Sequence, residues 1–194
     1  MRYSQTHKQE TRSRVLKAAA AAVRARGPDG VSVAEIMGEA GLTHGGFYAH
    51  FPNKEALVAA AIAEAFAQSR RRFGRMTEGM SGSEALTTFV DAYVSNEHRT
   101  NPQRGCPIAT ISSDLPRQGP AVRAAFDAGV NGLIGRLAAW LGADEGLATS
   151  LLSEMAGAVT LSRAVSDDAL AERLLDESRN RIKARMGLAK DLPQ

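Results

Sequence analysis

Cysteine, aromatic residues and long apolar runs are scarce in this chain of 194 residues. Its single cysteine, Cys106, cannot form an intramolecular disulfide, so nothing points to an oxidising compartment. Aromatic residues make up only 5% while alanine is abundant, which favours helices over strands. The apolar run 56–63 is too short to span a bilayer, and the first residues hold no apolar stretch of a secretory signal. We therefore expect a cytoplasmic protein that does not enter the membrane.

Sequence motifs of catalysis are also missing. The chain has no GxSxG, phosphate-binding loop, dinucleotide fingerprint, CxxC or HExxH. Ser112, Ser113 and Asp114 lack a motif around them, and His98 has no histidine near it in sequence. His44 and His50 are six residues apart on different faces of a short helix, which argues against a metal pair. We expect no enzyme activity, no cofactor and no bound metal.

The charge is distributed unevenly along the chain. The net charge is +3, but residues 1–54 alone carry eight basic and four acidic side chains and the remainder is slightly acidic. A positive field at one end suits a polyanion bound there, although basic clusters are often only solvated surface. A non-specific architectural DNA protein would be far more basic than this chain.

The pattern of apolar residues and caps predicts an all-α protein of about nine helices. A first helix is expected at 8–26, and a short second helix begins after Ser32, which forms a capping box with Glu35 and is followed by a stop at Gly41. A third is expected from His44 to His50, and a long fourth after Asn53. Later helices are expected at about 83–99, 105–114, 120–141, 145–165 and 168–186.

The third helix is expected to have two unlike faces. Phe47 and Phe51 are four residues apart and share one face, where they can form a small core with Ile36. The opposite face is polar and small. A short helix with a glycine pair propagates poorly, but small residues would let its backbone lie close to a DNA groove. The three helices therefore predict a helix-turn-helix with a reading motif at about 32–51.

The stretch SVAEIMGEAGLTHGGFYAHFPNKEALV closely resembles the DNA-binding region of TetR-type regulators. The resemblance implies a helix-turn-helix domain at 1–54, joined by a long helix to a ligand-binding and dimerisation domain at 55–194. It implies a transcriptional repressor that a small molecule releases from a palindromic operator. Two positions depart from the family pattern, Val23 in the first helix and Ala49 in the third, where aromatic residues are common.

The same resemblance implies specific DNA contacts. Tyr48 would donate its hydroxyl to a phosphate, His50 would lie against the DNA backbone, and Lys54 would bind a phosphate at the start of the fourth helix. Ser32 would contact phosphate from the second helix. The remaining positions expected to face base edges or adjacent phosphates are Thr43, His44, Gly45 and Gly46.

The last two long helices would pair with their copies in a homodimer, as the resemblance implies. An apolar stripe could serve this interface, with Gly157 and Ala158 permitting close approach, or could be intrachain core. Its residues are Leu147, Leu151, Leu152, Met155 and Val159.

An effector pocket is expected in the second domain, with Arg163 and Glu154 as polar anchors. Its candidate lining residues, each also a candidate for plain core, are Phe66, Phe89, Tyr93, Cys106, Phe126, Trp140 and Met155.

Cys106 lies in an Arg-Gly-Cys-Pro-Ile segment, which resembles a Gly-Cys segment of a subgroup of the family. Some members of that subgroup sense electrophiles or oxidants through this cysteine. A thiol at a helix N-terminus beside Arg104 would have more thiolate character. The alternative is a small, buried apolar residue.

Overall fold

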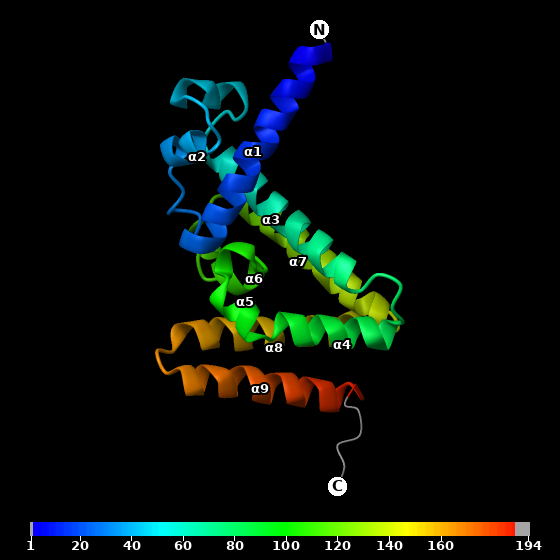
Figure 1. The fold of residues 1–194 in the computed structure, drawn as a ribbon. Coiled ribbons are helices and arrows are strands. Elements are labelled where there is room, and N and C mark those ends of the chain that lie inside the picture. Colours follow the sequence, from blue (N-terminus) through cyan, green and yellow to red (C-terminus); the bar gives the residue numbers. More distant parts are fainter. Residues whose placement is uncertain (1, 189–194) are drawn as a thin grey trace. The chain divides into compact units, whose positions relative to one another are not determined.

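The computed structural model describes residues 2–188, and the side chains of residues 7–188 except that of His44. The described part contains helices and no strand, so the prediction of an all-α fold is confirmed (Figure 1). Its α-helices are α1 (Arg2–Arg26), α2 (Val33–Glu39), α3 (Lys54–Met76), α4 (Gly82–Tyr93), α5 (Asn96–Thr100), α6 (Ile108–Ile111), α7 (Pro120–Trp140), α8 (Glu145–Ala164) and α9 (Asp168–Arg185). Three short 3₁₀ helices are η1 (His44–Ala49), η2 (Pro102–Arg104) and η3 (Leu115–Arg117).

Two predicted helices in the middle of the chain are wrong in extent. The helix expected at 83–99 is divided between α4 and α5, because Ser95 is extended and its hydroxyl accepts a hydrogen bond from the His98 backbone N–H as a new N-cap. The helix expected at 105–114 is reduced to the single turn α6, flanked by η2 and η3, both of which carry a proline in their first turn.

The described residues divide into two compact units. One contains the chain up to Gln68 together with Cys106–Gly129, and the other contains Ser69–Gly105 together with the chain from Val130 onward. Helices α3 and α7 each contribute residues to both units. This division follows packing alone. The predicted boundary at residue 54 between a DNA-binding domain and a second domain therefore stays a prediction.

An aromatic contact in the first unit requires a glycine. The rings of Phe66 on α3 and Phe126 on α7 meet edge to face, with centroids 5.6 Å apart. A Cβ atom at Gly129 would lie only 2.1 Å from the Phe66 ring. Phe66 is 4% exposed and packed against Phe126, so the ring has little room to move away. Gly129 therefore sets how closely these two helix segments approach.

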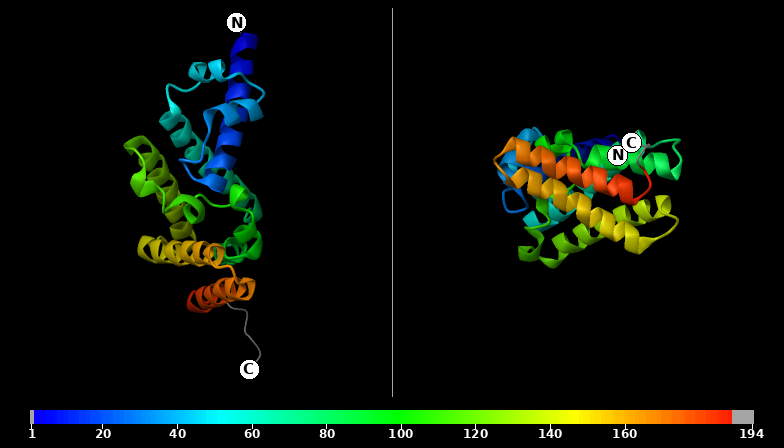
Figure 2. Two further views of the ribbon diagram at one scale, coloured as in Figure 1. Left: turned by 90° about the vertical axis from the view of Figure 1, so that its left-hand side faces the viewer. Right: turned by 90° about the horizontal axis from the view of Figure 1, so that it is seen from below.

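Helices α8 and α9 form a pair in the second unit and lie side by side in every view (Figures 1 and 2). The apolar stripe considered for dimerisation lies on α8, but Leu151, Met155 and Val159 are fully buried within the single chain and Leu152 is 4% exposed. These four residues are therefore intrachain core, as the alternative interpretation had it, while Leu147 is half-buried. A dimer interface on α8 would have to use other residues of the helix.

Two arginines exchange hydrogen bonds between α5 and α8 in the second unit. Arg163 on α8 donates to the carbonyl oxygens of His98 and Arg99, in the last turn of α5. Arg99 in turn donates to the Ser162 carbonyl oxygen on α8 at 2.9 Å and to the Asp168 carboxylate at 2.8 Å, in the first turn of α9. Carbonyls near the ends of two helices thereby gain partners that the helices themselves do not supply.

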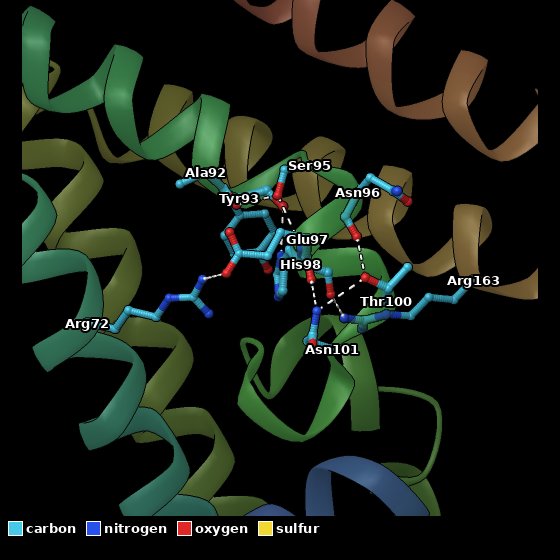
Figure 3. Close-up of polar contacts among 10 residues, drawn as sticks. All are labelled: Arg72, Ala92, Tyr93, Ser95, Asn96, Glu97, His98, Thr100, Asn101 and Arg163. Carbon is cyan, nitrogen blue, oxygen red and sulfur yellow. Dashed lines mark hydrogen bonds and ion pairs between the residues drawn. The ribbon is translucent and has the colours of Figure 1, made fainter.

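His98 is enclosed by this arrangement (Figure 3). Its side chain is 2% exposed, its Nδ1 lies 2.6 Å from the Tyr93 carbonyl oxygen, and its ring meets the Tyr93 ring edge-on at 4.7 Å. A Cβ atom at Gly105 would lie 2.7 Å from His98 Nε2, so this glycine leaves the space that the imidazole fills. Burial lowers the pKa of His98 to about 4 against the opposing effect of the Tyr93 hydrogen bond, and the positive charges of Arg163 and Arg72 lower it further.

Two glycines of α7 should respond oppositely to replacement by alanine. We expect Gly129→Ala to lower the free energy of unfolding by about 1–3 kcal/mol, because the new methyl group overlaps Phe66. Gly135→Ala, on the same helix with open space around it, should raise stability by up to about 1 kcal/mol through helix propensity. Urea unfolding of both variants tests this, and equal stabilisation by both would contradict the close packing.

The buried imidazole predicts a pH dependence of stability. Between about pH 4 and 6.5 the unfolded chain binds a proton that folded His98 does not, so the free energy of unfolding falls as the pH is lowered through this window. The full loss from this group is roughly 3 kcal/mol. Urea unfolding at several pH values should show a shallower fall in His98→Gln, whereas His7→Gln, which changes an exposed histidine, should keep the wild-type profile. Identical profiles for all three proteins would contradict this assignment.

Candidate nucleic-acid interface

The start of α2 is capped as the sequence predicts. The Ser32 side chain accepts a hydrogen bond from the Glu35 backbone N–H at 3.4 Å. A capping box would also need the Glu35 side chain to accept a hydrogen bond from the Ser32 backbone N–H. The Glu35 carboxylate instead pairs with the Arg26 guanidinium at 2.7 Å. Ser32 is half-buried at the head of α2.

The turn after α2 depends on a left-handed residue. Gly41 has φ +71°, a conformation that costs a side-chain-bearing residue roughly 1–2 kcal/mol. The chain then extends through Thr43, which is the N-cap residue of η1 but makes no capping hydrogen bond with its side chain. The predicted stop at Gly41 and the new start at Thr43 both agree with this geometry.

The third helix is a 3₁₀ helix and not the α-helix that was expected. The backbone N–H of Gly46 bonds to the Thr43 carbonyl, and that of His50 to the Phe47 carbonyl, both three residues back. Two adjacent glycines and a length of six residues disfavour an α-helix, and short helical segments commonly adopt this tighter form. The segment still presents two faces.

The two faces of η1 differ sharply in exposure. Phe47 and Phe51 are each 2% exposed and their rings stack with centroids 5.8 Å apart. Tyr48 is 67% exposed, which is unusual for so large a ring. Among the described side chains of η1, the exposed face therefore presents one large aromatic hydroxyl, that of Tyr48, beside the small residues Gly45 and Ala49.

The other expected contacts lie on or beside this face. Thr43 and Gly45 are exposed, and nothing lies within 4 Å of a Cβ atom built at Gly45, so the backbone there is open to a close approach. Gly46 is half-buried against Met37. The side chain of His44 lies outside the described side chains, so its DNA contact stays a prediction.

Lys54 lies at the first position of α3, after the Asn53 side chain has capped the helix by accepting from the Ala56 backbone N–H. Its exposed ammonium donates to the Asp29 carbonyl oxygen at 3.2 Å. Asp29 is also bound through its carboxylate by Gln118 at 3.0 Å. Both contacts stay within the first unit, and no sequence pattern predicts the hydrogen bond between Asp29 and Gln118, which are 89 residues apart.

His50 is the C-cap residue of η1 and is only partly accessible. Its Nδ1 atom is buried without a hydrogen-bond partner. Burial lowers the pKa of His50, and the positive charges of Lys8 and Arg12 lower it further. The ring is therefore mainly neutral near pH 7, and a phosphate placed beside it would favour its protonated form.

The candidate effector-pocket residues are divided between the two compact units. Phe66, Cys106 and Phe126 belong to the first unit, while the other four belong to the second. In the second unit, Phe89 packs against both Tyr93 and Trp140, with ring centroids 5.5 and 5.7 Å away. The proposed anchors Arg163 and Glu154 are engaged within the protein, with the last turn of α5 and with Arg185. The pocket stays a prediction.

A different cavity, of about 390 Å³, lies in the first unit. It is lined by the turn after α1, by the first turns of α3 and by the start of α7, and Lys54 and Asp29 are among its walls. None of the predicted pocket residues lines it. It adjoins the interface through Lys54.

Cys106 is 1% exposed. The cation placed near its sulfur by the fold is Arg24, which is itself buried, rather than exposed Arg104. Arg24 donates to the Ala65 carbonyl oxygen and to the Gln68 side chain on α3, and its burial lowers its pKa against the opposing influence of Cys106 and Glu64. The thiol is thus a core group beside a buried guanidinium.

Within the described residues, no group of three or more histidine, cysteine, aspartate or glutamate side chains is arranged to hold a metal ion. In the same part of the chain, every helix is too short or too polar to cross a bilayer.

Comparison with known proteins agrees with this geometry. Residues 15–61, which contain α2, η1 and the start of α3, match the sequence model of "Bacterial regulatory proteins, tetR family". The HTH-type transcriptional regulator UidR of Escherichia coli K12 is 29% identical over 111 residues, covering 57% of this chain and 55% of UidR. This chain thus matches about half the length of that curated relative.

Solved structures resemble the chain over nearly its whole length. A TetR transcriptional regulator from Chloroflexus aurantiacus is 26% identical, with a TM-score of 0.75, covering 94% of this chain and 97% of that one. The reduced form of E. coli NemR has a TM-score of 0.77 at 18% identity and covers 90% of this chain and 96% of its own, which shows a shared fold.

The burial of Cys106 predicts slow thiol chemistry in the folded state. N-ethylmaleimide should modify Cys106 much more slowly in native protein than in urea, because only transient opening exposes the sulfur. DNA affinity should be unchanged after brief native treatment, as it should be in Cys106→Ser. Rapid native modification that weakens DNA binding in the wild type alone would contradict this and would instead show a sensing thiol.

Proposed function

Because this chain belongs to the TetR family of bacterial regulators, we propose that it is a transcriptional repressor that leaves a palindromic operator when it binds a small-molecule effector. Its family relationships point to a DNA-binding regulator rather than an enzyme. Repression, release by a small-molecule effector and a palindromic operator are all parts of this proposal. We also propose a cytoplasmic location.

The observation that carries this proposal is the contrast between the two faces of η1. Two buried phenylalanines hold the segment, while the exposed Tyr48 hydroxyl and the open backbone at Gly45 face outward. The Lys54 ammonium lies five residues beyond the end of η1, on the exposed surface of the same unit. Hydroxyl and ammonium donors suit phosphate oxygens, and a bare backbone suits close approach to base edges.

A single short reading segment supplies little specificity, since each good base contact discriminates by only about 1–3 kcal/mol. We therefore propose a homodimer that reads two half-sites, paired through α8 and α9. The outward side of α8 offers a small-residue surface for such pairing, with open space around Gly157 and with Leu161 56% exposed. These residues replace the buried stripe as interface candidates.

For release, we propose that the effector favours a conformation in which α3 is displaced. Helix α3 is continuous from Lys54 to Met76, so displacement of its far end would move a predicted phosphate contact. The effector acts only if it binds the released conformation more tightly. An unchanged distance between the two reading segments of a dimer, with and without effector, would contradict this mechanism.

Binding to the DNA upstream of its own gene tests the proposed function. We expect a gel shift on an inverted repeat there, with affinity reduced about 10- to 100-fold in the double variant Tyr48→Phe, Lys54→Ala, since each of the two lost phosphate contacts costs about 0.7–1.4 kcal/mol. Arg123→Ala removes an exposed basic residue of α7, outside the proposed DNA contacts and dimer helices, and should bind as the wild type does. Equal affinity of the wild type for the repeat and for random duplexes would contradict a sequence-specific regulator.

A further inference from the structure

A second basic surface lies beside the reading segment, on α1. Lys8 and Arg12 are one helical turn apart and both are exposed. They flank the buried side of α1, which Thr11 and Val15 occupy. The Arg12 guanidinium carbon is 5.0 Å from the centre of the Phe51 ring, so this part of α1 lies against the end of η1.

His50 belongs to the same place. It directly precedes Phe51, and its ring centroid lies 6.5 Å from the Phe51 ring. Its Nδ1 is buried without a partner, and Lys8 and Arg12 are close enough for their charges to act on it. Two permanent cations and one titratable ring thus converge where α1 meets η1.

This cluster lacks compensating negative charge within the described part of the chain. No described carboxylate forms an ion pair with Lys8 or Arg12. Glu10, the only acidic residue of α1, lies two positions from each, on the opposite side of the helix. Like charges held together without a counterion repel, and a bound anion would relieve that repulsion.

We propose that Lys8 and Arg12 of α1 extend the backbone contact expected of His50 into a phosphate site for duplex DNA, separate from the contacts expected of Tyr48 and Lys54. The inference rests on the proposed DNA-binding function and adds α1 to its contact surface. Flexible cations beside an exposed reading segment suit phosphate oxygens, which carry no sequence information. The site therefore contributes affinity equally on operator and on random DNA.

The opposite flank of α1 supplies a matched control. Arg14 and Lys17 are also exposed and also basic, but they lie on the side of the helix that carries Glu10. The double variants Lys8→Gln, Arg12→Gln and Arg14→Gln, Lys17→Gln therefore remove the same charge from the same helix. Only the first removes it from the surface next to His50.

The experiment measures affinity for a random-sequence duplex and for the upstream inverted repeat from 50 to 200 mM KCl. Each lost phosphate contact should reduce the slope of log affinity against log salt by about 0.9. Because each protomer of the proposed homodimer loses two contacts, we expect the slope to fall by about 3.6 in Lys8→Gln, Arg12→Gln on both duplexes, and by less than half of that in the control pair. Equal falls in the two double variants would overturn the site, because they would reflect net charge alone.

Two single variants separate contact from folding. Lys8→Gln leaves the Arg12–Phe51 ring contact intact and should reduce the slope by about 1.8, one contact in each protomer, at an unchanged melting temperature, while Arg12→Lys should keep the wild-type slope. An unchanged slope in Lys8→Gln would overturn the site. Wild-type protein that binds both duplexes equally would defeat the proposed regulator but leave the phosphate site standing, so the two failures are distinguishable.

Discussion

The burial of Phe47 and Phe51 is the constraint on which the candidate interface depends. Four residues separate them, so one turn of backbone places both rings in the core formed with α2, where each is 2% exposed. Because η1 cannot rotate without exposing a phenylalanine, Tyr48 is held outward at 67% exposure and His50 is held at the edge beside α1. Burying two such rings contributes several kcal/mol, far more than a six-residue helix could supply through its own hydrogen bonds.

Local signals in the sequence predicted the elements of this region well. Ser32 and Asn53 cap the helices that follow them, and Gly41 adopts the left-handed conformation expected of it, because these effects depend on only a few neighbouring residues. The 3₁₀ geometry of η1 was missed because propensity distinguishes poorly between two tight helices. The break at Ser95 was missed although the apolar pattern ends at Val94 and the serine itself was a readable cap.

Distant partners could not be predicted. The exchange between Arg99 and Arg163 joins positions 64 residues apart, and the link from Asp29 to Gln118 spans 89 residues. The apolar stripe on α8 had the right period for a partner helix, but periodicity does not say whether that partner belongs to the same chain. Burial within one chain decided that question for Leu151 and Met155. The candidate DNA contacts came from one local motif and all belong to the first unit, whereas the pocket candidates came from scattered positions and belong to both units.

The position of Trp140 has a practical consequence. It is the only tryptophan of the chain, and its ring lies 5.7 Å from Phe89 in the second compact unit. Fluorescence excited at the red edge of protein absorption therefore reports on that unit alone, whereas helix content measured by circular dichroism reports on both. Coincident transitions by the two signals would mean that the DNA-facing unit and the rest of the protein unfold as one cooperative body. Separated transitions would give each unit its own stability, and would show whether the reading segment can melt while the remainder stays folded.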